Sequence, residues 1–269
     1  MTLNPGLYIV GTPIGNREDI TLRALKVLKE CDAIFCEDTR VSQTLLKMYG
    51  IQKPLLTYQD HNAESVRPQI LKRLALQQSV ALISDAGMPL ISDPGFKLVR
   101  ACQEQDFFVT VIPGPSAVLA GLILSGLPSD RFAFLGFADP RCFEQQQTLD
   151  LTLIFFESAK RLVKTLQQMS HVFHHRSVAV VREITKIYEQ TVHGNFETVL
   201  SYFQENPAKG EIVIVLSTPE KQTRSSLELD SLLKPMLEKL SLRDASDLAA
   251  KILGVSKKQV YQRALILTN

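Results

Sequence analysis

Residues 80–95 read VALISDAGMPLISDPG, and this stretch decides the class of fold. Val80–Ile83 is apolar without alternation, which is typical of a strand buried on both faces of a parallel sheet. The loop that follows is rich in glycine and proline, which let the backbone approach a ligand and hold a loop rigid. Open α/β sheets bind ligands at the carboxyl ends of their strands. The stretch therefore predicts an α/β fold with a binding loop after a strand.

Outward from this loop, short apolar runs alternate with helical patterns, which predicts parallel strands joined by right-handed helical connections. We expect an N-terminal α/β domain over residues 1–137. Its expected strands are Leu7–Val10, Ala33–Cys36, Leu55–Tyr58, Val80–Ser84, Phe107–Ile112 and Phe132–Phe137. Its expected helices are Leu22–Glu30, Ser42–Tyr49, Ala63–Gln77, Phe96–Gln105 and Ser116–Leu124.

Two more loops of glycine and proline follow strands, GTPIGN at 11–16 and PGPSA at 113–117. Ser116 would open a helix whose backbone N–H groups face a carboxylate. Any single loop of this kind reads more simply as a tight turn, but three at strand ends favour a ligand site. Neither a G-x-G-x-x-G fingerprint nor a P-loop is present, so the spacing does not name the ligand.

The second half changes rhythm, and we expect a second α/β domain over residues 138–218. Ala138–Asp150 is polar and fits a linker or flexible loop. Two strand patterns, Ser177–Ile184 and Ile187–His193, follow one another without a helix and predict a hairpin in a mixed sheet. The remaining patterns are strands at Leu151–Glu157 and Glu211–Ser217 and helices at Arg161–Met169 and Phe196–Gln204.

Residues 219–269 form a third part. A polar linker, Thr218–Ser226, precedes helices expected at Leu229–Leu240, Ala245–Leu253 and Lys257–Leu267. Gly254 ends the second and Ser256 caps the third, a pattern similar to a helix-turn-helix. Residues 221–269 hold nine Lys/Arg against five Asp/Glu, so this part is basic while the rest is slightly acidic. The imbalance suggests a polyanionic partner, although a solvated helical face gives the same count.

Composition excludes several classes of protein. With 45% apolar and 22% charged residues the chain is globular. Ala117–Leu124 is the longest run of apolar residues and glycine, far below the roughly 20 residues of a membrane span. The start of the chain reads as a strand and not as a signal peptide, so we expect a cytoplasmic protein. No C-x-x-C pair occurs, and the histidines at 171, 174 and 175 read as a solvated helix end, so we expect no metal.

The three loops, together with Glu37-Asp38-Thr39-Arg40, resemble the tetrapyrrole methylase superfamily and within it the bacterial ribosomal RNA small-subunit methyltransferase I family. The resemblance continues along nearly the whole chain, through Gly126–Phe132, Leu153–Ser158, Arg182–Lys186, Lys209–Val213 and Gly254–Lys258. It implies two α/β domains with a cofactor cleft between them and a small C-terminal helical module. It also implies S-adenosylmethionine as cofactor and 2′-O-methylation of a cytidine in the decoding region of 16S rRNA, in the 30S subunit, by a homodimer.

The resemblance also assigns site residues. The cofactor contacts it implies are Pro13, Ile14, Asp85, Gly87, Leu90, Ile91, Ser116, Ala117, Phe155, Arg182, Gly210 and Glu211. The basic residues expected to contact RNA are Arg141, Lys160, Lys186, Lys257 and Lys258. The chain departs from the family at GFADPR, residues 136–141, where the family has Gly-Phe-Leu-Pro and a basic pair. It also carries Lys160 in place of the usual histidine.

Transfer of a methyl group from a sulfonium is an in-line displacement, which requires alignment and a group that takes the hydroxyl proton. We expect Asp38, Arg40 and Glu157 to be the catalytic residues, with Asp38 as the base and Glu37 beside it at the substrate site. The alternative for Glu37, Asp38 and Arg40 is an ion pair that holds a helix start. Glu157 and Glu183 would bind donor or ribose phosphate, or form a salt-bridge network. Tyr261 and Arg263 would contact RNA, or pack within a three-helix cap.

Two other functions fit the same pattern. One is methylation of a small tetrapyrrole, against which the basic C-terminal module argues. The other is a non-catalytic RNA-binding module on a methylase scaffold, which the altered loop over Ala138–Gln147 favours. Donor binding followed by methyl transfer to 30S subunits would separate the three.

Overall fold

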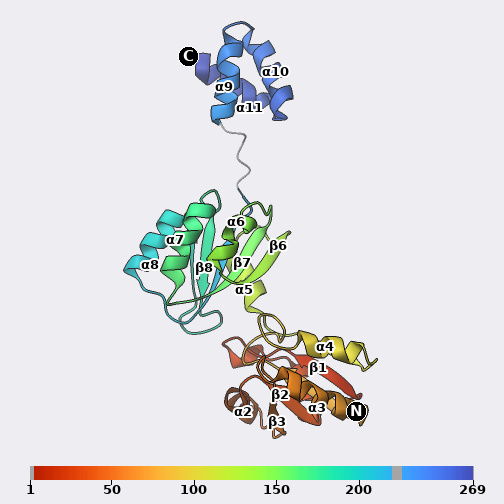
Figure 1. Ribbon diagram of the computed structural model, residues 1–269. Helices are drawn as coiled ribbons and strands as arrows, with labels where there is room; N and C mark the ends of the chain where they lie inside the picture. The colour runs from red at the N-terminus through yellow and green to blue at the C-terminus, as the bar shows by residue number, and fades with distance from the viewer. Residues whose placement is uncertain (1–2, 220–225, 269) are drawn as a thin grey trace. The chain divides into compact units, whose positions relative to one another are not determined.

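The computed structural model describes residues 3–219 and 226–268. The chain divides into two compact units, with the boundary between Thr218 and Pro219, and each unit is described by itself (Figure 1). Most of the linker expected at Thr218–Ser226 lies outside the described residues, as do the basic Lys221 and Arg224. Among the described residues, no helix combines the length and the hydropathy that a membrane span requires.

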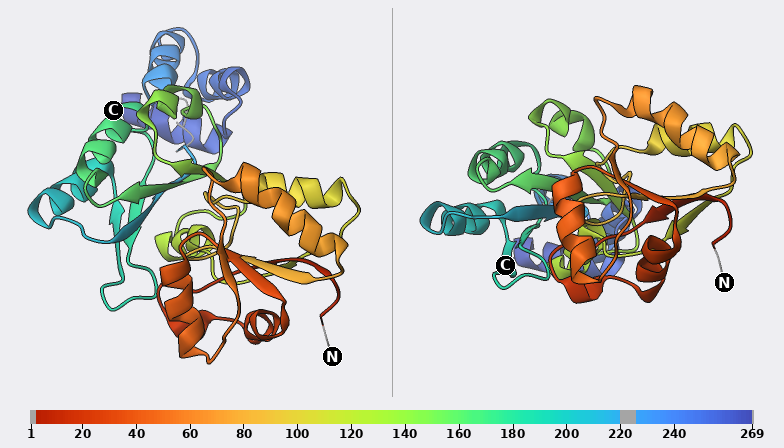
Figure 2. Two further views of the ribbon diagram at one scale, coloured as in Figure 1. Left: turned by 60° about the horizontal axis from the view of Figure 1, so that its bottom comes forward. Right: turned by 90° about the horizontal axis from the view of Figure 1, so that it is seen from below.

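The first sheet has five parallel strands in the order β3-β2-β4-β1-β5. Alternate residues of each strand point to opposite faces, so Tyr8 and Val10 pack under one pair of helices and Leu7 and Ile9 under the other. Helices therefore cover both faces (Figures 1 and 2). The strands are β1 (Gly6–Val10), β2 (Ala33–Cys36), β3 (Leu55–Thr57), β4 (Ser79–Ile83) and β5 (Val109–Ile112). The helices are α1 (Leu22–Glu30) and α2 (Thr39–Met48) on one face, and α3 (Ala63–Ala75) and α4 (Phe96–Gln103) on the other, with a 3-10 turn η1 (Arg17–Asp19).

The second sheet is mixed, with the order β6-β7-β10-β8-β9. β6 and β7 are parallel and the other pairs are antiparallel, so the predicted hairpin of β8 and β9 is confirmed. The strands are β6 (Phe132–Phe137), β7 (Thr152–Ser158), β8 (Val178–Arg182), β9 (Gln190–Gly194) and β10 (Glu211–Leu216). The helices are α5 (Ala117–Ser125), α6 (Phe143–Gln146), α7 (Leu162–Val172) and α8 (Phe196–Glu205), with a 3-10 turn η2 (Pro140–Cys142).

The expectation that Phe132–Phe137 closes the first domain is wrong, because β6 pairs with β7 in the second sheet. α5 also belongs there: its Val118 and Leu122 pack with Ile154 and Val213. The helix is apolar on almost every side, and Gly121 lets it approach closely, since a Cβ at that position would lie 2.7 Å from Val213 Cγ1. The chain therefore passes from the first sheet to the second at the PGPS loop, before α5 begins.

Ala138–Asp150 is not the flexible loop that its polarity predicts. It contains η2 and α6, and Phe143 is buried at the edge of the second core. The Phe143 ring makes edge contacts with Phe155 and Phe173, whose ring centroids lie 6.1 and 5.6 Å away. One aromatic residue thus anchors a segment whose other residues suggested a linker.

The second unit has three helices in its described residues, α9 (Ser226–Leu237), α10 (Leu242–Leu253) and α11 (Lys257–Thr268). They pack around a small core that includes Leu233, Ala249 and Val260. Gly254 ends α10 in the left-handed conformation (φ +64°), as the sequence predicts. The short turn after it makes α10 and α11 a helix-turn-helix pair.

Candidate active site

The three loops that end β1, β4 and β5 meet. Thr12 and Gly87 exchange backbone hydrogen bonds, N to O, of 2.9 and 3.2 Å. Gly11 and Gly114 lie backbone to backbone, since a Cβ on Gly11 would fall 2.8 Å from Gly114 Cα. Only glycine allows this approach, so the glycines that mark the loops in the sequence are the residues that let the loops assemble.

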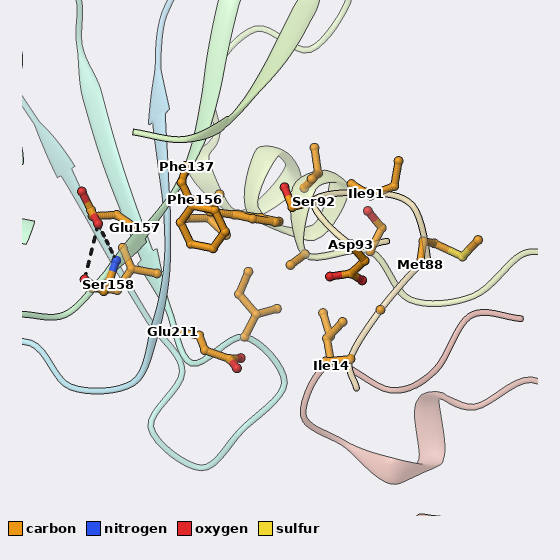
Figure 3. Close-up of a pocket in the computed structure, with 18 of the residues that line it drawn as sticks. Ile14, Met88, Ile91, Ser92, Asp93, Phe137, Phe156, Glu157, Ser158 and Glu211 are labelled. Atoms are coloured by element: carbon orange, nitrogen blue, oxygen red, sulfur yellow. Dashed lines mark hydrogen bonds between the residues drawn. The ribbon is translucent and has the colours of Figure 1, made fainter. Parts of the chain in front are cut away.

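A cavity of about 350 Å³ opens beside these loops (Figure 3). This volume lies within the range of about 300–1,000 Å³ that is typical of small-molecule sites. One wall comes from the first two loops, the second from the start of α5 and the third from the second sheet. The lining residues are Ile14, Ala86, Gly87, Met88, Ile91, Ser92 and Asp93; Ser116, Ala117 and Val118; and Phe137, Phe156, Glu157, Ser158, Ile184, Gly210, Glu211, Ile212 and Val213.

The expected cofactor residues divide into two groups. Those that line the cavity are Ile14, Gly87, Ile91, Ser116, Ala117, Gly210 and Glu211. Five others do not line it: Pro13, Asp85, Leu90, Phe155 and Arg182. Asp85 accepts a hydrogen bond from the Asp38 backbone N (3.0 Å), and Arg182 Nε donates to Gln190 Oε1 (2.7 Å). These two side chains hold neighbouring segments in place.

Phe155 is the clearest correction to the expected contacts. Its side chain is fully buried in the core under α7 and α8, on the face of β7 opposite to the cavity. Successive residues of a strand point to opposite faces, so Phe156 points toward the cavity instead. Figure 3 shows the Phe156 ring beside Phe137, and the two ring centroids lie 5.7 Å apart. An aromatic residue was expected at this wall, but the residue that lines the cavity is Phe156 and not its neighbour Phe155.

Ser116 begins α5 at the wall of the cavity. Its backbone is extended, and its Oγ accepts a long hydrogen bond from the Leu119 N–H (3.5 Å), so it occupies the N-cap position. Ser116, Ala117 and Val118 all line the cavity. The positive end of the helix, with its unpaired backbone N–H groups, therefore faces the space where a carboxylate would bind.

Asp38 and Arg40 do not line the cavity. Asp38 caps α2 by accepting the Arg40 backbone N–H (2.8 Å), and its carboxylate pairs with the Arg40 guanidinium at 2.6 Å. The hydrogen bonds from Arg40 lower the pKa of Asp38 to about 2. A carboxylate with so low a pKa is a poor acceptor of a hydroxyl proton. The structure therefore matches the alternative, an ion pair that holds a helix start.

Glu157 lines the cavity, but its carboxylate is already bound on both oxygens. It accepts hydrogen bonds from the Ser158 backbone N (2.7 Å), Arg161 Nε (2.8 Å) and Thr165 Oγ1 (2.5 Å). Its side chain is fully buried, and it ties the end of β7 to the start of α7. Glu157 therefore fixes the position of Ser158 in the cavity wall.

Asp93 is a residue to which the sequence assigned no role of its own. Its carboxylate lines the cavity, and Figure 3 shows it pointing into the space that Glu211 also faces. Burial raises the pKa of Asp93, and the charges of Asp85 and Asp60 raise it further against a hydrogen bond from Ser84. Ser92 before it adopts a positive φ of +67°, a conformation that non-glycine residues avoid and that gathers at functional sites.

The second-sheet wall depends on a charge cluster. Lys186 Nζ contacts Glu183 Oε1 at 2.8 Å and Glu211 Oε2 at 3.1 Å. The Lys186 hydrogen bond lowers the pKa of Glu183. Gly210 must be glycine, because its φ is +85° and a Cβ would lie 2.1 Å from Glu183 Oε1. Of the two roles considered for Glu183, the observed one is a salt-bridge network.

The basic residues expected to contact RNA are not equally available. Arg141 pairs with Asp139 (2.7 Å), Lys186 with the two glutamates, and Lys257 with Asp247. Lys160 and Lys258 are exposed and have no ion-pair partner among the described residues. In the second unit Arg263 pairs with Asp230 (2.6 Å), so it braces the helices. Within residues 3–219 and 226–268 no group of His, Cys, Asp and Glu is arranged to hold a metal ion.

Comparison with known proteins assigns the family. Residues 6–200 match the family model of tetrapyrrole (corrin/porphyrin) methylases, and residues 223–268 match that of the RsmI C-terminal HTH domain. The ribosomal RNA small subunit methyltransferase I of Rickettsia prowazekii is 43% identical over 97% of this chain and 96% of that protein. The protein of the same name from Thermotoga maritima is 42% identical over 80% of this chain and 99% of that protein.

Solved structures share the fold. Diphthine synthase superposes with a TM-score of 0.61 at 14% identity, over 78% of this chain and 89% of that one. The Thermus thermophilus uroporphyrin-III C-methyltransferase complexed with S-adenosylhomocysteine gives 0.56 at 21% identity, over 79% and 97%. The expected fold class and the expected resemblance are thus confirmed. The chain belongs to the ribosomal RNA small subunit methyltransferase I family, within the tetrapyrrole methylases.

Proposed function

We propose that this protein transfers a methyl group to the 2′-oxygen of a cytidine in the decoding region of 16S rRNA, in the 30S subunit. As a family member it is an S-adenosylmethionine-dependent methyltransferase of small-subunit rRNA. The cavity walled by the three loops, α5 and the second sheet is the observation that carries the proposal. We place the reaction in the cytoplasm, where ribosomal subunits are found.

The residues of the cavity fit this cofactor. The start of α5 offers backbone N–H groups for its carboxylate, and Phe137 and Phe156 offer aromatic surface for its adenine. Glu211 adds a carboxylate that would accept hydrogen bonds from its hydroxyl or ammonium groups. When bound, S-adenosylmethionine would supply a methyl group on a sulfonium, whose sulfur leaves as a neutral thioether and needs no acid.

The chain has three tasks in this reaction. The loops around Gly11, Gly87 and Gly114 are held against one another. A fixed site of this kind reduces the entropy cost of aligning the donor methyl group with the ribose oxygen. The apolar side chains of Ile14 and Phe156 exclude water. Asp93 takes the proton of the ribose hydroxyl at its carboxylate, since it is the cavity carboxylate whose pKa burial raises. No task falls to Asp38.

The decisive experiment supplies purified protein with labelled S-adenosylmethionine and 30S subunits that lack the modification. We expect label at the 2′-oxygen of one cytidine of 16S rRNA, located by primer extension and by mass spectrometry of the digested nucleosides. Methyl transfer to a base, or only to a tetrapyrrole, would contradict the proposed chemistry. Failure to bind S-adenosylmethionine in calorimetry would remove the enzymatic function.

We further propose a homodimer. α5 presents Leu119 and Ile123 to solvent, 51% and 76% exposed, and these residues lie four apart on one face of the helix. A second copy of the chain would cover this apolar face. Sedimentation equilibrium should give twice the chain mass of 30.1 kDa; a single-chain mass would contradict the dimer.

Lys258 in the second unit carries a prediction of its own. It is the second residue of α11 and has no ion-pair partner among the described residues, whereas its neighbour Lys257 pairs with Asp247. We expect Lys258→Gln to weaken RNA binding and to reduce the slope of log affinity against log salt by about 0.7 to 0.9, because one phosphate contact is lost. Filter binding at several salt concentrations measures this slope.

Lys257→Gln is the matched control, since it removes the same charge from a lysine already engaged. It should change the slope less than Lys258→Gln does. Equal slopes for wild type and Lys258→Gln would show that α11 does not contact phosphate. Donor affinity should be the same for all three proteins.

A further inference from the structure

The loop between β8 and β9, residues 183–189, ends in two uncovered apolar side chains. Ile187 is 94% exposed and Tyr188 is 71% exposed. Exposure of large apolar groups costs solubility and contributes nothing to the core. Two such residues side by side at a loop tip therefore point to a partner.

The loop is held rigidly, so this exposure is a defined presentation. Thr185 N donates to Glu189 Oε2 (2.6 Å), and Glu189 N donates to the Lys186 carbonyl (3.1 Å). From the loop after β1, Asn16 N donates to Thr185 Oγ1 (2.9 Å). Glu183 and Thr185 hold positive φ angles of +52° and +64°, strain that the surrounding hydrogen bonds maintain.

The tip stands next to the cavity. Ile184 lines the cavity, and the loop's Lys186 bonds to Glu211, which also lines it. Figure 2 shows the turquoise hairpin of β8 and β9 projecting from the end of the second sheet. Ile187 and Tyr188 directly follow Lys186 in this loop, so they lie within a few residues of the cavity lining.

This end of the sheet also carries one exposed lysine that can contact a phosphate. Ser158 pairs with Glu211 in the sheet register, so Lys160, two residues further on, emerges at the same end as the loop. Lys160 is exposed and has no ion-pair partner among the described residues. Lys186 is neutralised by two glutamates, so the tip itself offers apolar surface and its neighbour offers a cation.

We propose that Tyr188, supported by Ile187, is a stacking platform for an unpaired RNA base next to the methylated nucleotide, while Lys160 contacts the adjoining phosphate. Unpaired bases are commonly recognised by stacking on aromatic rings, and an exposed tyrosine at the entrance of a nucleotide site suits this role. The inference rests on the proposed function and assigns its substrate contact outside the cavity.

The test compares Tyr188→Ala and Tyr188→Phe in the full chain, with 30S subunits as substrate. Tyr188→Ala should raise KM for the subunits about tenfold, the effect of one lost base stack, with kcat changed less than KM. The salt slope of binding should stay as in wild type, because no charge is lost. Tyr188→Phe keeps the ring and should restore KM.

Two controls separate this role from folding. Donor affinity, measured by calorimetry, should be the same in all variants. Leu22→Ala removes another strongly exposed apolar side chain, 86% exposed at the start of α1, and should leave KM unchanged.

An unchanged KM in Tyr188→Ala would overturn the inference, and so would a KM that Tyr188→Phe fails to restore. A fall in solution mass in Tyr188→Ala would overturn it too, because the tip would then contact a second copy of the chain. If the wild-type protein itself fails to methylate the subunits, the proposed function fails; a methylating wild type with an indifferent Tyr188 defeats only the stacking platform.

Discussion

Ser116→Trp is expected to weaken donor binding by at least ~100-fold, because the indole would occupy a cavity of about 350 Å³ at the start of α5. Tryptophan brings a rigid aromatic side chain with a surface of roughly 150–250 Å² to a position that now carries one hydroxyl. The positive end of α5 would be covered at the same time, so the donor carboxylate would lose its partner. Titration calorimetry with S-adenosylhomocysteine measures the loss directly.

Ser116→Ala is the control for this variant. It removes the N-cap hydrogen bond to Leu119 N but leaves the cavity open. Loss of this long hydrogen bond should lower the free energy of unfolding by at most about 1 kcal/mol. The donor affinity should change only severalfold. If Ser116→Trp binds the donor as tightly as wild type, the cavity is not the donor site.

Asp93→Asn is expected to lower kcat by about 10²–10⁴-fold while donor affinity stays close to wild type. The amide has nearly the same shape as the carboxylate but does not accept the hydroxyl proton. Single-turnover transfer to 30S subunits measures the rate, and calorimetry measures the affinity. Asp38→Asn is the matched control, because Asp38 lies outside the cavity lining and asparagine also caps a helix.

The pH dependence supplies an independent readout. Burial raises the pKa of Asp93 above the ordinary 3.8, so the wild-type rate should fall as pH decreases through this raised pKa. Asp93→Asn should lack this acidic limb. A raised pKa also means that ionised Asp93 opposes folding. The free energy of unfolding should therefore decrease as pH rises from the ordinary pKa to the raised pKa of Asp93. The asparagine variant should therefore be at least as stable as wild type at neutral pH. A limb that persists in Asp93→Asn would assign the proton to another group.

Much of the site follows from local sequence. The loops ending β1, β4 and β5 are marked by glycine and proline within a few residues of an apolar run, and such patterns survive in any α/β context. Ile14, Gly87, Ser116 and Gly210 reach the cavity because they lie in these loops or at a strand start. The family resemblance pointed to the same segments.

Other assignments depend on which partner each charged side chain meets in the folded chain. Asp38 and Asp93 are both acids after strands, yet one is taken by Arg40 and the other points into the cavity. Lys257 and Lys258 are adjacent, yet only the first has an acid in reach among the described residues. The sequence shows which residues are charged, but the folded conformation sets which of them form ion pairs.

The α/β class, the family and the position of the three binding loops follow from the amino-acid sequence alone, because they depend on residue patterns within short windows. The folded structure was needed to show that β6 and α5 belong to the second sheet, that Phe156 and not Phe155 faces the cavity, and that Asp93 lines the cavity while Asp38 does not. Strand pairing and register, and with them the face to which each side chain of a strand points, are set by partner strands that lie tens of residues away along the chain. The pairing of a charge depends on the folded backbone even at short range, since Asp38 and Arg40 are only two residues apart.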